Sequence, residues 1–247
     1  MAIDRFPPNP GYGDGIFRRR MTLTGQSAVV TAELFDDYHH MRCRLTHDGE
    51  QVTGISGEVL RFPFSTCGGA DAALKELVGR ELDAGAGLYR NGGPQRNCTH
   101  LFDLAAFAID FAPAMGRRTI EIEIEDQRVD EPAVARARVD GVLVHDWSIA
   151  QETIVAPYAD RSLFSGFVPW ARARFGGVPL QAALQIQKGA LVARGRRYIV
   201  DRSGGGLTDE PERIGSCFSF TEPNFSAAQR LHGYARDLRE GFPGDLS

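Results

Sequence analysis

Residues 119–125 (TIEIEIE) alternate between apolar and charged or polar side chains with a period of two residues. In an extended chain this places Ile120, Ile122 and Ile124 on one face and glutamates on the other. A strand with one apolar and one charged face is typical of an antiparallel sheet that is covered on one side only. The segment therefore constrains the chain to a sheet with a single buried face.

Two Asp-Gly dipeptides separate strand-like runs, and this dipeptide favours a tight type I′ hairpin turn. The two hairpins are expected at 38–60, turning at Asp48-Gly49, and at 133–149, turning at Asp140-Gly141. Residues 21–34 are rich in β-branched side chains and are predicted as a further strand. These strands predict a sheet built from hairpins.

Apolar residues at helical spacing predict several helices. They are expected over residues 70–78 (ending at Gly79), 101–111 (capped by Thr99), 163–175, 179–192 (started by Pro179) and 224–239 (capped by Asn224). Together with the hairpins, they predict an α+β fold, an antiparallel sheet with helices packed on one side.

The chain is expected to divide into three parts. Residues 1–20 are an extended N-terminal arm because the first 18 are rich in Pro, Gly and Asp; residues 21–160 are the α+β core; residues 161–247 are a helical and irregular extension packed on that core.

Composition excludes several function classes. The chain has 247 residues, 43% of them hydrophobic, and a net charge of −4. The chain contains no run of 18 apolar residues, so we expect no membrane partner. Its acidic balance argues against a nucleic-acid partner. The first 20 residues lack the apolar core of a secretory signal, so we expect a cytoplasmic protein.

The most informative chemistry lies at two predicted helix starts, which carry Cys67 and Cys98. The helix macrodipole favours an anion there, so we expect a lowered pKa for both thiols, which would then serve as nucleophiles or metal ligands. His100 and Asp103 follow Cys98 on the same helix, and Asp103 is spaced to orient the imidazole. The alternative is that both cysteines are small buried residues.

A second cluster is Asp36-Asp37-Tyr38-His39-His40, in which Asp37, Tyr38 and His39 are the catalytic candidates. On a strand Asp37 and His39 would share a face, so that Asp37 could orient a basic imidazole or both could bind a metal; the alternative is a solvated strand edge. Cys43 and Cys217 are expected in the core. Three arginines are candidates for binding a carboxylate: Arg196, Arg197 and Arg236.

Several of these motifs resemble an uncharacterised bacterial family known as a domain of unknown function. The motifs are Cys67-Gly68-Gly69-Ala70, Asn97-Cys98-Thr99-His100-Leu101, Gly166-Phe167 to Trp170, Gly195-Arg196 and Gly215-Ser216-Cys217-Phe218 to Pro223. The resemblance extends over nearly the whole chain. It implies no activity, although members resemble accessory or catabolic proteins of bacteria that degrade acyl or aromatic compounds. The family's closing Gly-Ser-x-Arg-Asp-Phe is here Gly233 to Leu238, with two departures.

A more distant resemblance is to the NifU-like iron–sulfur scaffold. The segment from Arg61 through Cys67-Gly68-Gly69-Ala70 to Cys98-Thr99-His100-Leu101 is similar to it. That resemblance implies a metal site made by Asp37, Cys67 and Cys98, with His100 as a substitute ligand. Phe35 stands where the scaffold has its first cysteine, which argues against cluster assembly and leaves a single Zn or Fe ion as the candidate cofactor.

Three functional hypotheses follow. The first is an enzyme without nucleotide or flavin, a lyase or hydrolase that acts on a small aromatic or acyl compound in bacterial catabolism. Its catalytic residues would be Asp37, Tyr38, His39, Cys98, His100 and Asp103. The second is the metal-binding scaffold with Asp37, Cys67, Cys98 and His100. The third is a non-catalytic partner subunit. The C-terminal region is compatible with a homodimer.

Overall fold

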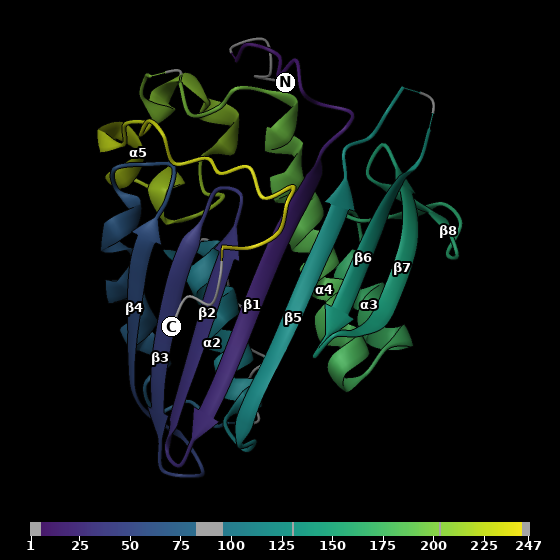
Figure 1. The fold of residues 1–247 in the computed structure, drawn as a ribbon. Helices are drawn as coiled ribbons and strands as arrows, with labels where there is room; N and C mark the ends of the chain where they lie inside the picture. Colours follow the sequence, from purple (N-terminus) through teal and green to yellow (C-terminus); the bar gives the residue numbers. More distant parts are fainter. Residues whose placement is uncertain (1–5, 83–95, 130, 203, 244–247) are drawn as a thin grey trace. The chain divides into compact units, whose positions relative to one another are not determined.

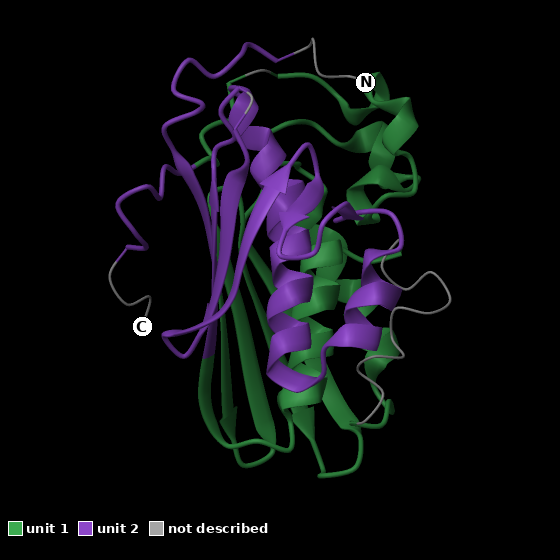
Figure 2. Ribbon diagram, turned by 90° about the vertical axis from the view of Figure 1, so that its right-hand side faces the viewer, with its two compact units in different colours: residues 1–2, 21–118, 201–235 green, residues 3–20, 119–200, 236–247 purple. Residues whose placement is uncertain are grey.

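The structure is a computed structural model, and it describes residues 6–82, 96–129, 131–202 and 204–243. The chain forms two compact units that interleave along the sequence (Figure 2). Unit 1 comprises residues 1–2, 21–118 and 201–235, and unit 2 comprises residues 3–20, 119–200 and 236–247. The division into an arm, a core and an extension stays a prediction.

The sheet of unit 1 is a meander in which consecutive strands are neighbours, in the order β4-β3-β2-β1 (Figure 1). Its strands are β1 (Ile16–Gln26), of which residues 21–26 belong to this unit, β2 (Val29–Asp36), β3 (His40–His47) and β4 (Val52–Arg61). β2 pairs antiparallel with β3, from Val29 opposite Thr46 to Phe35 opposite His40. This register brings the end of β2 and the start of β3 to one tight turn.

Two helices cover one face of this sheet. The 3₁₀ helix η2 (Cys67–Leu77) packs on β4, and α2 (Thr99–Phe111) packs on β2 and β3. Nearly all of α2 is buried, because Leu, Ala and Phe occupy most of its circumference. The later segment of unit 1 contains only short elements: η5 (Leu207–Asp209), η6 (Pro211–Arg213), η7 (Phe218–Phe220) and α5 (Asn224–Ala227).

Unit 2 repeats this plan with its own part of β1. Residues 16–20 of β1 lie beside β5 (Gly116–Glu125), which is followed by β6 (Ala133–Val139), β7 (Val142–Ala150), β8 (Thr153–Ala156) and β9 (Arg161–Ser162). The helices are α3 (Phe167–Arg174), α4 (Gly177–Ala193) and the 3₁₀ turn η4 (Arg194–Arg197). α4 packs on β6 and β7, where Gly189 lets it approach Ile122, Ile124 and Phe17.

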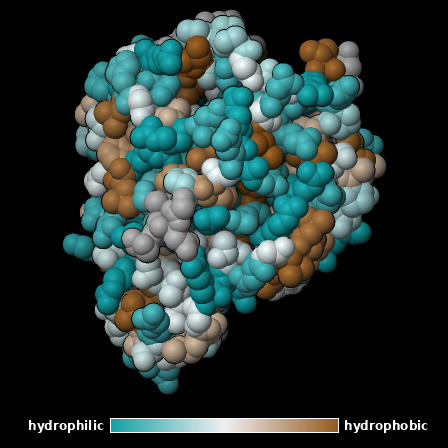
Figure 3. All heavy atoms as spheres, viewed as in Figure 1, coloured by the Kyte–Doolittle hydropathy of each residue, from teal (hydrophilic) through white to brown (hydrophobic). Residues whose placement is uncertain are grey.

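The faces of the strands that point away from the helices are charged. Arg18 and Arg138 both pair with Glu123 in unit 2, and Arg42 pairs with Glu33 in unit 1. Many hydrophilic residues accordingly lie on the face seen in Figure 3. This arrangement explains the alternation in residues 119–125, where the isoleucines are buried and the glutamates face the arginines.

The α+β expectation is confirmed, and the Asp140-Gly141 turn is of the predicted type, since both residues have positive φ. Several details were wrong. Residues 21–34 are not one strand but parts of β1 and β2, and Asp48-Gly49 lies in a longer loop in which Asp48 accepts hydrogen bonds from the backbone of Glu50 and Gln51.

Helix ends also differ from the expectation. The residue that caps α2 is Cys98 rather than Thr99, and α4 begins at Gly177, two residues before Pro179. The predicted helix over 224–239 ends at Ala227, after a single turn, because Ala228 is already extended and its successors bond to other segments of unit 1, as in the Phe64–Arg230 bridge.

Gly25 on β1 tests the packing of unit 1. A β-carbon at this position would collide with the backbone carbonyl oxygen of Ala114, whereas one at Gly68 would meet no atom within 4 Å. Gly25→Ala should therefore lower the free energy of unfolding by about 1–3 kcal/mol, and Gly68→Ala should change it by less than about 0.5 kcal/mol. Urea unfolding of both variants measures this, and equal stabilities would contradict the packing described.

Candidate functional site

The turn between β2 and β3 is organised by the carboxylate of Asp36, whose side chain is fully buried. The backbone N–H of Asp36 donates to the carbonyl of His39 at 2.9 Å, which closes the turn. Asp36 Oδ1 in turn accepts the backbone N–H groups of Tyr38 and His39, both at 2.8 Å. Asp commonly holds turns in this way because its short side chain reaches the backbone two and three residues on.

The same oxygen of Asp36 lies 3.1 Å from Nδ1 of His39. A carboxylate is an acceptor, so this contact places a proton on Nδ1 and leaves the lone pair on Nε2. His39 Nε2 makes no hydrogen bond to any residue that the structure describes. The imidazole is one-tenth exposed, so most of its surface is enclosed by the protein.

His100 brings α2 to this turn. It lies in the first turn of the helix, which follows the extended N-cap residue Cys98, and its ring stacks on that of His39 with 4.1 Å between centroids and 28° between planes. His100 is more exposed than His39. The two imidazoles and the carboxylate of Asp36 therefore form one cluster between the β2–β3 turn and the start of α2.

Arg61, the last residue of β4, holds the backbone of this turn. Its guanidinium donates to the carbonyl oxygens of Asp36, Asp37 (2.8 Å) and His39 (3.1 Å), and also to that of Tyr234 (2.7 Å). Its planar face lies over the ring of Phe35, 4.8 Å from the centroid. A guanidinium has five fixed N–H donors, which suits it to gather several carbonyls at one point.

Aromatic rings border the cluster. Tyr38 contacts His39 edge to face at 6.5 Å between centroids, and Tyr234 contacts Tyr38 in the same way at 6.2 Å. Burial raises the pKa of Tyr234 to about 12, so its hydroxyl stays protonated at neutral pH. Two tyrosine rings thus border the cluster.

The residues named from the sequence are only partly brought together. His39 and His100 are in the cluster, Tyr38 borders it, and Asp37 is buried within the turn. Asp103 is buried on α2, one turn after His100. Residues 37–39 form a turn, not a strand, so the alternating faces expected for Asp37 and His39 do not apply.

The thiols behave differently from the expectation. Cys98 packs with its sulfur 3.9 Å from that of Met41, and Cys67 lies 3.3 Å from the hydroxyl of Ser219. Burial raises the pKa of Cys98 and raises that of Cys67 to about 11. The prediction of lowered pKa values was wrong, because burial destabilises a thiolate by more than a helix N-terminus stabilises it. Cys43 is in the core as predicted, whereas Cys217 is partly exposed.

One group among the described residues has the composition of a metal site. Ligand atoms of Asp36, His39 and His100 all lie within 4.8 Å of one another. Of the ligands named from the sequence, His39 and His100 belong to this group, whereas Asp37, Cys67 and Cys98 do not. Asp36 was given no role because the whole cluster was interpreted as a strand, in which Asp37 rather than Asp36 shares a face with His39. An Asp followed three residues later by His is the spacing that one turn brings together.

The comparisons with known proteins give one match. The family model described as "Protein of unknown function (DUF2889)" matches residues 18–114, so the expected similarity to an uncharacterised family is confirmed for that segment. The matched segment contains the β2–β3 turn, Arg61 and the start of α2. No curated protein matches the chain. Within the described residues no helix is long and apolar enough to cross a membrane.

Arg61→Ala tests the role of the guanidinium in the turn. The substitution removes a charged donor from the carbonyl groups of four buried residues, so it should lower the free energy of unfolding by about 2–4 kcal/mol. Arg44→Ala, an exposed arginine on β3, should change it by less than about 0.5 kcal/mol. Chemical denaturation compares the two, and a tolerated Arg61→Ala would show that the turn does not depend on this residue.

Thiol labelling tests the burial of the cysteines. With a pKa near 11, only about one in a thousand Cys67 side chains is a thiolate at pH 8, and Cys98 is further protected. Cys217 should therefore react first with an alkylating reagent in the native protein. Peptide mapping by mass spectrometry measures the order. Labelling of Cys67 or Cys98 ahead of Cys217 would restore the helix-start hypothesis.

Proposed function

We propose that the chain is an enzyme that acts on a small molecule by acid/base chemistry, with His39 as the group that transfers the proton. The observation that carries this proposal is the hydrogen bond between buried Asp36 and Nδ1 of His39. Such a carboxylate fixes the tautomer of an imidazole and stabilises the imidazolium that forms when Nε2 takes a proton. Here Asp36 fills the orienting role first assigned to Asp37.

The remaining residues have supporting roles in this proposal. His100, stacked on His39 and more exposed, would donate a second proton to the same substrate or accept one from it. Tyr38 provides a flat apolar surface beside the base. These features favour a lyase or hydrolase reaction on a small aromatic or acyl compound, in bacterial catabolism, where a base removes one proton and a second group returns one.

A second candidate is a single Zn or Fe ion bound by Asp36, His39 and His100, whose ligand atoms are close together. Two histidines and a carboxylate are a common donor set for such ions. An ion, however, lies in the plane of each imidazole that binds it, and rings stacked at 28° cannot both direct a lone pair at one ion until one of them turns. Acid/base chemistry is therefore the better-supported function.

Substitution of the histidines tests the proposal. In an assay with a small aromatic or acyl compound that the protein converts, His39→Gln should lower kcat by about 10²–10⁴-fold because it removes the base. Glutamine is chosen because its side chain is similar in size to that of histidine. His232→Gln changes an exposed histidine in the same unit and should leave kcat unchanged. Turnover that survives His39→Gln would contradict the assignment.

Metal analysis of the untagged protein separates the two candidates. Under the acid/base proposal, added Zn²⁺ or Fe²⁺ leaves the activity unchanged and chelation does not abolish it. A stoichiometric ion that is lost in both His39→Gln and His100→Gln, together with the activity, would instead assign the cluster to metal binding.

A further inference from the structure

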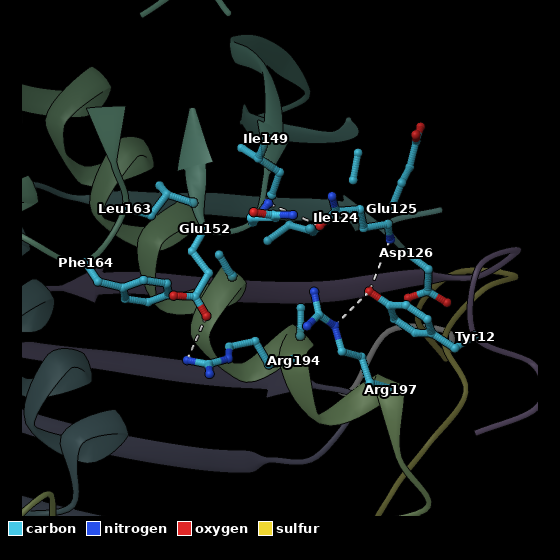
Figure 4. A pocket seen from close by; sticks show the side chains of 15 residues that line it. Tyr12, Ile124, Glu125, Asp126, Ile149, Glu152, Leu163, Phe164, Arg194 and Arg197 are labelled. Carbon is cyan, nitrogen blue, oxygen red and sulfur yellow. Dashed lines mark hydrogen bonds and ion pairs between the residues drawn. The ribbon is translucent and has the colours of Figure 1, made fainter. Parts of the chain in front are cut away.

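Unit 2 contains a small pocket (Figure 4). It is lined by Tyr12, which precedes β1, by residues at the ends of several strands, and by the end of α4 together with η4. It has a cavity volume of about 50 Å³. Its walls are mostly apolar, and Figure 4 shows Leu163 and Phe164 on the side opposite Tyr12 and Arg197. The apolar lining comprises Ile124, Ala133, Ile149, Leu163, Phe164, Ala190 and Ala193.

The carboxylates that line the pocket are already paired with arginines. Glu152 bonds to Arg194 at 3.0 Å, and Glu125 lies 3.4 Å from Arg136. Asp126 is buried, and Arg196 approaches both of its oxygens, at 2.7 and 3.1 Å. Arg196, one of the arginines that the sequence proposes for carboxylate binding, is thus used within the protein.

Its neighbour Arg197 differs from these arginines. It has no carboxylate partner in the part of the chain that the structure describes. Its Nε donates to the hydroxyl oxygen of Tyr12 at 3.2 Å, and its two terminal nitrogens make no hydrogen bond to described residues (Figure 4). A guanidinium with two parallel donors available is suited to a planar two-oxygen anion.

Tyr12 adds a donor at the same place. Its hydroxyl oxygen accepts two hydrogen bonds, from Arg197 Nε and from the backbone N–H of Gln127, both at 3.2 Å. A hydroxyl that accepts twice still has its own hydrogen to donate, and no described residue accepts it. Arg197 and Tyr12 therefore present donors to one rim of an apolar pocket.

We propose that this pocket binds a short-chain monocarboxylate, with the carboxylate on Arg197 and Tyr12 and the alkyl group against Leu163 and Phe164. The cavity volume limits the size of the ligand. A water-sized group needs about 10–15 Å³, so a cavity of 50 Å³ holds roughly three to five non-hydrogen atoms. Propionate has this size. The proposal does not rest on the chemistry of His39, because every residue of the pocket belongs to unit 2.

Titration of the full-length protein with sodium propionate, followed by ¹H–¹⁵N NMR, tests the proposal. The Gln127 amide and Arg197 Nε resonances should shift in a saturable way, with a Kd in the millimolar range expected for so small a ligand. Arg197→Ala should weaken binding about tenfold or more, and Tyr12→Phe, which removes the donor, should weaken it less.

Two controls make the result specific. Arg44→Ala, which removes an exposed arginine of unit 1, should leave the affinity unchanged, and propionamide, which has the same shape without the charge, should not compete. Absence of a saturable shift at Gln127, equal affinity of Arg197→Ala, or competition by propionamide would each overturn the proposal. His39→Gln should bind propionate normally, so failure of one proposal is distinguishable from failure of the other.

Discussion

The hydrogen bonds of the Asp36 carboxylate are the interaction on which the rest of the site depends. A fully buried charge is costly unless donors surround it, and Asp36 receives two backbone N–H groups and the imidazole of His39. The same contacts that satisfy the charge shape the β2–β3 turn and orient the imidazole. Because one oxygen serves both tasks, the local fold and the placement of the proposed base cannot be separated.

Arg61 supports this turn from the other side. It uses its donors on backbone carbonyls, so the positive charge stabilises the conformation of residues 36–39. The turn is thus held by a carboxylate that binds N–H groups and a guanidinium that binds carbonyls. This complementarity explains how a loop of three residues between two strands can present a histidine in one fixed orientation.

Periodicity was enough to predict the sheet, the charged outer faces and α2, because burial on one face leaves a repeating trace in the sequence. It could not predict the site, since the pairing of Asp36 with His39 arises from a turn that interrupts the alternation.

The pKa values of the thiols depend on which of two opposing effects is larger. A helix terminus stabilises an anion by about 0.3–1 kcal/mol, whereas full burial shifts a pKa by as much as three to five units. Burial prevails at Cys67 and Cys98.

The tautomer of His39 tests the central claim most directly. Long-range ¹H–¹⁵N NMR correlations of the imidazole distinguish a protonated Nδ1 from a protonated Nε2. If Asp36 holds the ring as described, neutral His39 carries its proton on Nδ1 and has a lone pair on Nε2, and Asp36→Ala disturbs this preference. A proton on Nε2 in the unaltered protein would contradict the account, because Nε2 would then have no lone pair with which to accept a proton.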